Sequence, residues 1–354
     1  TAGSFGLVSS FNAIGGKYKK FSYYVYNHSR SAKGWRENNR FQARNTHAFL
    51  EYRFTDKTKI SAEYTNSDYE MQQPGGLTDA QFATNSRDSF RERNWFGVPW
   101  NIFSVNFDTK VNTNFDVSVK AFGLIGERNS VGFTGAANVV DAYAKRQVDS
   151  DNYKNFGVEN RNLYRYSLGK LKNNLAFGMR LYQAKTERFQ KGVGTTGSDF
   201  DLSIEGKFPT QLEFLTKNFA LFAENQFKIN EKFSITPGVR YEHVNSTSKD
   251  GIIKLNDGVL IVAEKNIVIN KPLFGIGFEY KLKQTNFYAN ISQAYRPVLF
   301  GDLNPSSNIT DVIDPNLKDS KGYNADLGYR GLYKKFLNFD VSVFYLSYQD
   351  RVGR

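Results

Sequence analysis

A period-two alternation of apolar and polar residues recurs along the chain and constrains its fold more than any other feature. In residues 219–229, FALFAENQFKI, Phe219, Leu221, Ala223, Phe227 and Ile229 occupy one parity, and Glu224, Gln226 and Lys228 occupy the other. Residues 233–243 repeat the pattern after the turn NEK. This period is typical of a β-strand with one apolar and one polar face. Two such strands joined by a short polar turn predict an antiparallel hairpin.

The same unit recurs along the whole chain, and pattern counting gives about seven hairpins, or about fourteen strands of about ten residues each. Turns inside the hairpins are short: TDK, NNL, NEK, KQT and YKK. Connections between hairpins are long: 67–100, 125–160, 187–217, 247–270 and 297–321. Repeated long loops argue against a soluble domain, whereas this asymmetry is typical of an outer-membrane barrel. We therefore predict an all-β fold, a transmembrane antiparallel up-and-down β-barrel with short periplasmic turns and long extracellular loops.

The composition agrees with a membrane barrel. Aromatic residues make up 16% of the chain, although the mean hydropathy is −0.53. Disordered chains are poor in aromatics, so the rings must be gathered on one face of a folded structure. The apolar parity carries almost no charge, as expected where Arg or Lys at the bilayer midplane would cost about 2–4 kcal/mol. No run of about 18 apolar residues occurs, so no transmembrane helix is predicted.

No enzyme signature stands out in the sequence. The motifs G-x-S-x-G and H-E-x-x-H and a phosphate-binding loop are all absent, and the chain has no cysteine. The histidines His28, His47 and His243 lie far apart, and we expect His47, on the charged parity of its strand, to face the lumen rather than a metal. We predict a protein that is not an enzyme and has no metal site or cofactor of its own.

The net charge of +12 permits an anionic partner. A nucleic acid is not expected, because no basic helix occurs and the aromatics lie on the face opposite the charges.

Several longer motifs carry a family resemblance. They are QQPGGLTDAQF at 72–82, GSFG at 3–6, KGWREN at 33–38, NSRDSFRERNWFG at 85–97 and ISQAYRPVLFGDLNP at 291–305. With these motifs the chain resembles TonB-dependent outer-membrane receptors over essentially its whole length, and most closely the branch that includes ferric citrate and siderophore receptors.

The resemblance implies a barrel of about 22 strands in the outer membrane of a Gram-negative bacterium. It also implies a plug domain that couples the receptor to the TonB-ExbB-ExbD complex, with outer-membrane lipid and lipopolysaccharide around the barrel. We therefore expect residues 1–354 to form a partial β-barrel domain, with the plug domain and the C-terminal strands absent. The function expected is active uptake of a ferric chelate, such as ferric citrate or another carboxylate siderophore.

Five arginines in the predicted loops are the candidate ligand contacts. Arg87, Arg91 and Arg93 follow the motif, and Arg128 and Arg146 fall in the next predicted loop. Guanidinium groups pair bidentately with carboxylates, which a ferric chelate would offer. The alternatives are a solvated loop or contacts with lipopolysaccharide.

The loop motif itself, Pro74, Gly75, Gly76, Leu77 and Thr78, must bend the chain, because proline fixes φ and glycine permits positive φ. It cannot continue a strand.

Two other classes of function fit the alternation. A passive porin would have the same strands, and a soluble or surface-attached β-rich adhesin would share the two-faced pattern. In a receptor, polar side chains such as Arg180, Glu224 and Arg240 would line a wet lumen. The PGGLT motif and the segment after Arg296 favour the receptor.

Overall fold

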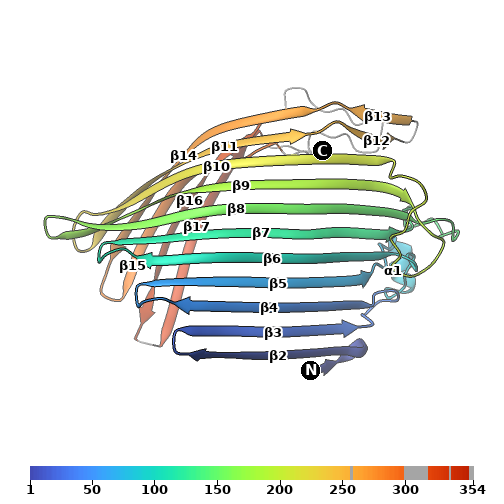
Figure 1. Cartoon of the computed structure of the whole chain (residues 1–354), viewed down its shortest axis with the longest axis horizontal. Coiled ribbons are helices and arrows are strands. Elements are labelled where there is room, and N and C mark those ends of the chain that lie inside the picture. Colours follow the sequence, from blue (N-terminus) through green and yellow to red (C-terminus); the bar gives the residue numbers. More distant parts are fainter. Residues whose placement is uncertain (256–257, 299–317, 335, 351–354) are drawn as a thin grey trace.

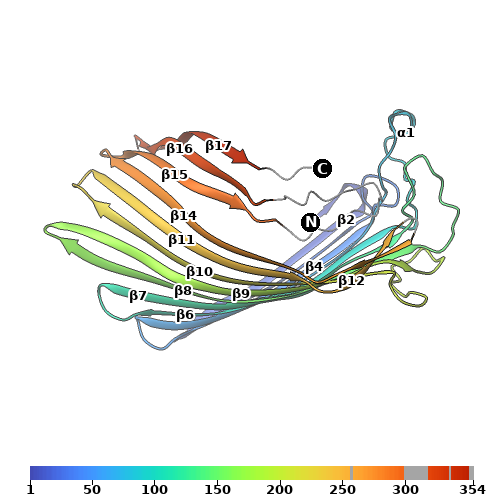
Figure 2. The same ribbon diagram turned by 90° about the horizontal axis from the view of Figure 1, so that it is seen from above.

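The chain folds into one curved antiparallel sheet (Figures 1 and 2). The structure is a computed structural model that describes residues 1–255, 258–298, 318–334 and 336–350. The elements begin with β1 (Ala2–Gly3) and a 3₁₀ turn (Ser4–Gly6). The long strands and the single short helix of the first half are β2 (Leu7–Tyr18), β3 (Phe21–Ala32), β4 (Phe41–Arg53), β5 (Thr58–Gln72), α1 (Asp79–Thr84), β6 (Trp95–Lys110), β7 (Phe115–Gly132) and β8 (Gln147–Leu168).

The second half continues the sheet. Its described strands are β9 (Leu171–Val193), β10 (Thr210–Lys228), β11 (Phe233–Ser248), β12 (Gly251–Leu255), β13 (Gly258–Val262), β14 (Lys265–Lys281), β15 (Thr285–Arg296), β16 (Ser320–Tyr333) and β17 (Leu337–Gln349). The short hairpin of β12 and β13 is inserted between β11 and β14, which pair directly with each other. The predicted all-β antiparallel fold is confirmed, and the strands other than β1, β12 and β13 match the predicted hairpins.

Between the described ends of the sheet, no pairing joins β17 to β2, so the sheet is open like a cut barrel (Figure 2). Each other long strand pairs with the strands on both sides of it. The meander follows chain order, which is the up-and-down topology expected from short hairpin turns.

One face of the sheet is apolar. The register aligns Val105 with Ala121, Val158 and Leu181 in successive strands, so one row of apolar side chains crosses β6 to β9. Leu181 is 48% exposed. Large exposed apolar side chains aligned in this way are what a lipid-facing surface requires. We call this side of the sheet the apolar face.

The other face carries charged and amide side chains. Lys120, Glu159, Arg180 and Glu242 lie in one row across this polar face. Glu224 and Arg240 share the face, as predicted, because they have the same parity as the residues of that row. His47 also lies here, where its Nδ1 is 2.8 Å from Thr65 Oγ1 and its ring stacks on Tyr26.

The strands are longer and the connections shorter than the sequence predicts. Strand β2 has 12 residues and β9 has 23, against the expected length of about ten. The predicted loops 125–160 and 187–217 shrink to 133–146 and 194–209. Backbone pairing continues into segments in which apolar and polar residues no longer alternate regularly, so the period-two pattern underestimates the length of the strands.

The turn predicted at NNL, residues 173–175, is wrong. Those residues belong to β9, and the chain reverses at Gly169 and Lys170 instead. Gly169 has a φ of +60°, the left-handed conformation that glycine adopts at little cost. The motif at 291–305 and the loop 297–321 fall partly outside the described residues.

Candidate functional site

The connections 73–94, 133–146 and 194–209 lie at one end of the sheet, together with α1 and the β12–β13 hairpin (Figure 1). Short turns such as 229–232 close the opposite end. Antiparallel hairpins produce this arrangement, because each connection joins two neighbouring strands at the same end of the sheet. The candidate ligand contacts gather at the end with the long connections.

The loop motif at 74–78 makes a sharp turn and starts the helix. Gly75 has a φ of +73°, and its carbonyl oxygen accepts a hydrogen bond of 2.7 Å from Arg36 Nη1. Thr78 caps α1 in a capping box: its hydroxyl accepts from the backbone N–H of Gln81, whose side chain accepts from the backbone N–H of Thr78. These bonds explain why the strand pattern is interrupted here.

Arg93 is buried among the connections, with only 2% of its surface exposed. Its Nε and Nη2 donate to the two carboxylate oxygens of Asp141 at 2.8 and 2.7 Å. Its Nη1 donates to the carbonyl of Thr196 at 2.9 Å, and the ring of Tyr143 lies 4.9 Å from its guanidinium carbon. The hydrogen bonds from Arg93 hold the pKa of Asp141 below its usual value.

Arg146 is buried beside Arg93, with 1% of its surface exposed. Its Nη1 donates to the carbonyls of Asp199 at 2.6 Å and Arg93 at 3.3 Å, and its Nη2 donates to Thr195 Oγ1 at 3.0 Å. The Asp199 carboxylate lies 3.6 Å from Nη2. Burial lowers the pKa of Arg146 below its usual value, although arginine stays charged at physiological pH. Arg93 and Arg146 thus tie all three connections together.

A small apolar cluster lies beneath these arginines. Trp95, Val131 and Val148 are buried at the ends of β6, β7 and β8, and four side chains of the connection 194–209 pack against them: Phe200, Leu202, Ile204 and Phe208. Trp95 Nε1 donates to the carbonyl of Ser198 at 2.7 Å. The three connections and the strand ends below them therefore form one packed unit, which we call the connection cluster.

Arg87 and Arg91 contact backbone carbonyls nearer the surface. Arg87 Nε donates to the carbonyl of Trp35 at 2.8 Å. Arg91 Nη2 donates to the carbonyl of Gly135, and its guanidinium lies 5.0 Å from the ring of Phe133. Four of the five predicted arginines thus bind protein carbonyls, a structural role that the sequence does not reveal. Ligand contact by these side chains stays a prediction.

Arg128 lies elsewhere, because it belongs to strand β7 and not to a loop as predicted. The register places it beside Asp151 of β8, which in turn pairs with Arg188 of β9. Asp151 Oδ2 is 3.3 Å from Arg128 Nη1, and Asp151 Oδ1 is 2.9 Å from Arg188 Nε. Two guanidinium groups therefore share one carboxylate on the polar face, close to the connection cluster. We call these three residues the arginine pair site.

Sequence reasoning missed Arg188 and Asp151. Arg188 is 37 residues from Asp151 in the chain. Their parity in β8 and β9 places both side chains on the polar face, and this could be read from the sequence. Only the correct turn at Gly169 and Lys170, however, aligns the two strands so that the side chains meet.

An antiparallel sheet with an apolar and a polar face, short turns at one end and long connections at the other defines the wall of a transmembrane β-barrel. The family comparison narrows the class. Residues 3–354 match the model of the family described as TonB dependent receptor-like, beta-barrel. The chain belongs to this family, which confirms the resemblance read from the sequence motifs.

Solved structures of receptors share the fold. The unliganded ferric citrate transporter FecA superposes with a TM-score of 0.82 at 19% identity, covering 99% of this chain and 50% of that one. The ferric-catecholate import receptor Fiu of Escherichia coli K12 gives 0.80 at 10% identity, over 98% and 57% of the two chains. The ferripyoverdine receptor of the Pseudomonas aeruginosa outer membrane gives 0.77 at 13%, over 99% and 48%. The chain thus spans about half the length of these structures.

A search of the curated proteins gives no match to the sequence. Within the described residues, no helix is both long and apolar enough to cross a membrane. In the same part of the chain, no group of three or more histidine, cysteine or acidic side chains could hold a metal ion. The expectation that the protein has no metal site or cofactor of its own stays a prediction.

Proposed function

We propose that this chain forms part of the wall of an outer-membrane receptor of a Gram-negative bacterium, which takes up an anionic ferric chelate. Family membership supports a receptor barrel, and the names of the three proteins compared above all refer to ferric compounds. The observation that carries the choice of an anionic ligand is the arginine pair site, where two guanidinium groups share the single carboxylate of Asp151.

The arginine pair site keeps a positive charge available to a ligand. Asp151 is 3% exposed and neutralises one guanidinium charge, while the side chain of Arg128 is 55% exposed. Arg188 donates from both Nε and Nη2 to Asp151, and these two bonds fix the orientation of its guanidinium group. Arg128 contacts the carboxylate through Nη1 alone. The other donors of Arg128 can therefore pair with a carboxylate of the chelate. The ring of Phe96, 5.6 Å from the Arg128 guanidinium carbon, limits where that group can move.

The chelate would be cargo rather than cofactor. Release through the barrel would require work from the inner membrane, delivered by a TonB-ExbB-ExbD complex acting on a plug domain. This distinguishes the proposed receptor from a passive porin, in which uptake would continue without the energised complex. The polar face would line the path, and lipid with lipopolysaccharide would surround the apolar face.

Titration of the full-length receptor with ferric citrate, and with iron-free citrate, tests the proposal. We expect Arg128→Gln to weaken ferric citrate binding by about tenfold to a hundredfold, because a charge-assisted hydrogen bond contributes roughly 1.5–3 kcal/mol. Arg188 remains in this variant to neutralise Asp151, so the fold is preserved. Arg161→Gln is the matched control, since Arg161 also lies on the polar face beside a single acidic partner, Glu159.

Equal binding of ferric citrate by the wild type and Arg128→Gln would remove the arginine pair site from the proposal. Binding that is lost only in Arg87→Ala or Arg91→Ala would move the ligand contact to the connections. A folded receptor that binds no ferric chelate would overturn the proposed substrate and leave the family assignment intact.

A further inference from the structure

The polar face carries the charge pattern of the arginine pair site a second time, on the same three strands. A basic side chain of β7, an acidic side chain of β8 and a basic side chain of β9 lie side by side in Lys120, Glu159 and Arg180. We call these three residues the lower row. On each strand it lies eight residues from the arginine pair site, toward the short turns. At about 3.3 Å per residue, the two sites are roughly 26 Å apart along the wall.

The polar face of β7, β8 and β9 is uncharged between the two sites. The three rows that separate them are Gly126, Tyr153 and Thr186, then Leu124, Asn155 and Ala184, and then Phe122, Gly157 and Tyr182. Charge on these strands is therefore concentrated at two levels. An anion that moves along this wall meets two positively charged sites, separated by a stretch that offers it no ionic partner.

The acidic side chains near the lower row are paired with arginines outside it. Glu159 forms an ion pair with Arg161, and Glu242, in the same row but on β11, forms one with Arg240 at 2.5 Å. Both arginines lie one row nearer the short turns. The single negative charge of Glu159 thus faces three cations, one more than Asp151 faces at the arginine pair site.

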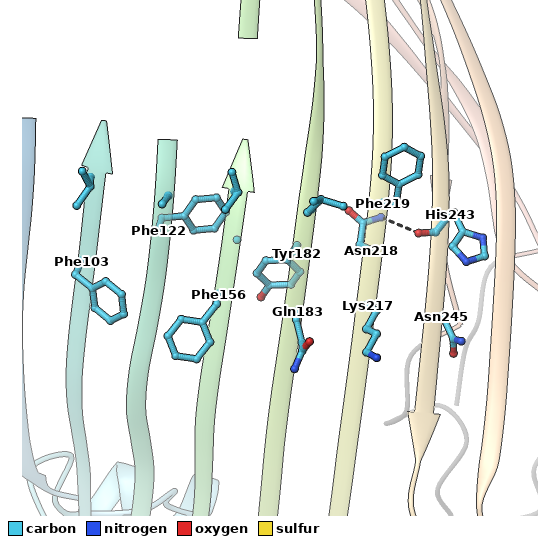
Figure 3. A pocket seen from close by; sticks show the side chains of 15 residues that line it. Phe103, Phe122, Phe156, Tyr182, Gln183, Lys217, Asn218, Phe219, His243 and Asn245 are labelled. Atoms are coloured by element: carbon cyan, nitrogen blue, oxygen red, sulfur yellow. Dashed lines mark hydrogen bonds between the residues drawn. The ribbon is translucent and has the colours of Figure 1, made fainter. Parts of the chain in front are cut away.

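Lys120 and Arg180 keep their charges available. Neither side chain forms an ion pair or a hydrogen bond with any residue that the structure describes. The guanidinium carbon of Arg180 lies 5.5 Å from the ring of Phe122 and 5.1 Å from the ring of Tyr182, on the two strands that flank β8 (Figure 3). These rings hold the guanidinium in place and leave its hydrogen-bond donors free for a carboxylate. An aromatic ring holds Arg128 in the same way at the arginine pair site.

From this arrangement we infer that the lower row is a second binding site for carboxylate anions, which the ligand occupies after it leaves the arginine pair site. Arg180 pairs with a carboxylate of the ligand, and Lys120 supplies a second positive charge beside it. Several weak sites in series let an ion enter a pathway and also leave it. The order of the two sites rests on the proposed function, whereas the attraction of the lower row for anions does not depend on the identity of the chelate.

The reaction rates of an introduced thiol test the lower row without any chelate. This chain has no cysteine, and Ser118 lies on the polar face two residues from Lys120. We use full-length Ser118→Cys receptor with no other cysteine, in cells with an energised TonB-ExbB-ExbD complex. An anionic methanethiosulfonate reagent should react faster than a cationic one of the same size. The ratio of the two rates cancels any change in the ionisation of the thiol, which affects both reagents alike.

Lys120→Gln combined with Arg180→Gln should lower this ratio roughly fivefold for each charge removed, because a unit charge about 4 Å away has about that effect in water. The matched control is Lys154→Gln combined with Lys217→Gln, which removes the same charge from the apolar face. An equal ratio with and without Lys120 and Arg180 would overturn the inference. So would a thiol that reacts with neither reagent, because another part of the receptor would then cover the lower row.

Uptake of ferric citrate tests the place of the lower row in transport. We expect Arg180→Gln to leave the Kd for ferric citrate unchanged and to lower the maximal uptake rate roughly fivefold, the effect of one charge. Arg180→Lys keeps the charge and should retain most of the rate, whereas Arg128→Gln raises the Kd. An unchanged maximal rate in Arg180→Gln would overturn the second site. A wild type that binds no ferric citrate would overturn the proposed substrate instead, and the thiol reaction would still decide the inference.

Discussion

Arg93 and Arg146 bring two positive charges into a buried cluster, and protein acceptors replace water around both. Arg93 has a bidentate partner in Asp141, whereas the nearest acceptors of Arg146 are a backbone carbonyl and a hydroxyl. A charge that loses water is costly unless such partners surround it. These two arginines therefore hold the connections in one arrangement, and a ligand could reach them only by displacing those bonds.

At the residue scale, Asp141→Asn tests this role. Removing one partner of a buried ion pair costs about 3 kcal/mol, so we expect faster hydrogen exchange in residues 133–146 and 194–209. The control is Glu205→Gln, which removes the exposed pair with Lys145 and should change exchange little. Unchanged exchange in the Asp141 variant would show that the connections are held by other contacts.

The carboxylate of Asp141 makes the stability of the connection cluster depend on pH. Arg93 holds the pKa of Asp141 below its ordinary value of 3.8. Because this pKa is depressed in the folded state, the ionised carboxylate stabilises the fold fully above its ordinary pKa. That stabilisation is lost as the pH falls through the lower pKa of the folded state. We expect wild type and Asp141→Asn to differ at pH 7 and at pH about 5, and to converge only as the pH falls below the ordinary pKa of 3.8. Tryptophan fluorescence, which reports on buried Trp95, follows the change; convergence already at pH about 5 would contradict the assignment.

At the element scale, β8 and β9 show how local signals define a hairpin and where they fail. Both strands were expected from alternation, but their shared turn was placed at 173–175 instead of Gly169 and Lys170. Asn173 and Asn174 are polar and look like turn residues, yet they pair inside the ladder with Tyr166 and Arg165. Asn173 Oδ1 accepts the backbone N–H of Lys228 at 2.8 Å, which explains an amide at that place in a strand.

Helix α1 gives a second prediction at this scale. It has only six residues, so its stability depends on its cap. Thr78→Ala removes the capping hydroxyl and should destabilise the helix by about 1 kcal/mol. We expect faster hydrogen exchange at 79–84 in this variant, and little change in Thr84→Ala at the other end. Equal exchange in both variants would mean that packing, rather than the cap, holds the helix.

At the scale of the whole molecule, the sheet is a wall between two environments. The apolar and polar faces are built from alternate residues of the same strands, so a new charge should destabilise the fold much more on the apolar face than on the polar face. Leu181→Arg, on the apolar face of β9, should cost about 2–4 kcal/mol of folding free energy in lipid. Ala184→Arg, on the polar face of the same strand, should cost much less.

Urea titration of the full-length receptor refolded into lipid vesicles measures this difference. Similar losses for Leu181→Arg and Ala184→Arg would contradict the assignment of the two faces. The comparison also separates a membrane wall from a soluble sheet, in which the apolar face would be covered by protein rather than lipid.

The sequence by itself determined the succession of long hairpins, the two faces and the end that carries the long connections, although not the exact strand ends or the short hairpin of β12 and β13. The features that it determined follow from periodicity and turn chemistry, which act between near neighbours and are readable in one chain. The family could also be recognised, because its motifs are continuous segments such as QQPGGLTDAQF.

Only the tertiary structure decided what the charged side chains contact. Arg93 could be read as a ligand contact until Asp141 and Thr196 were found around it. The register of β7, β8 and β9 places Arg128 beside Asp151, which also contacts Arg188. A guanidinium group has the same chemistry in a buried cluster and in an open site, so its role depends on which acceptors the fold brings within hydrogen-bond distance.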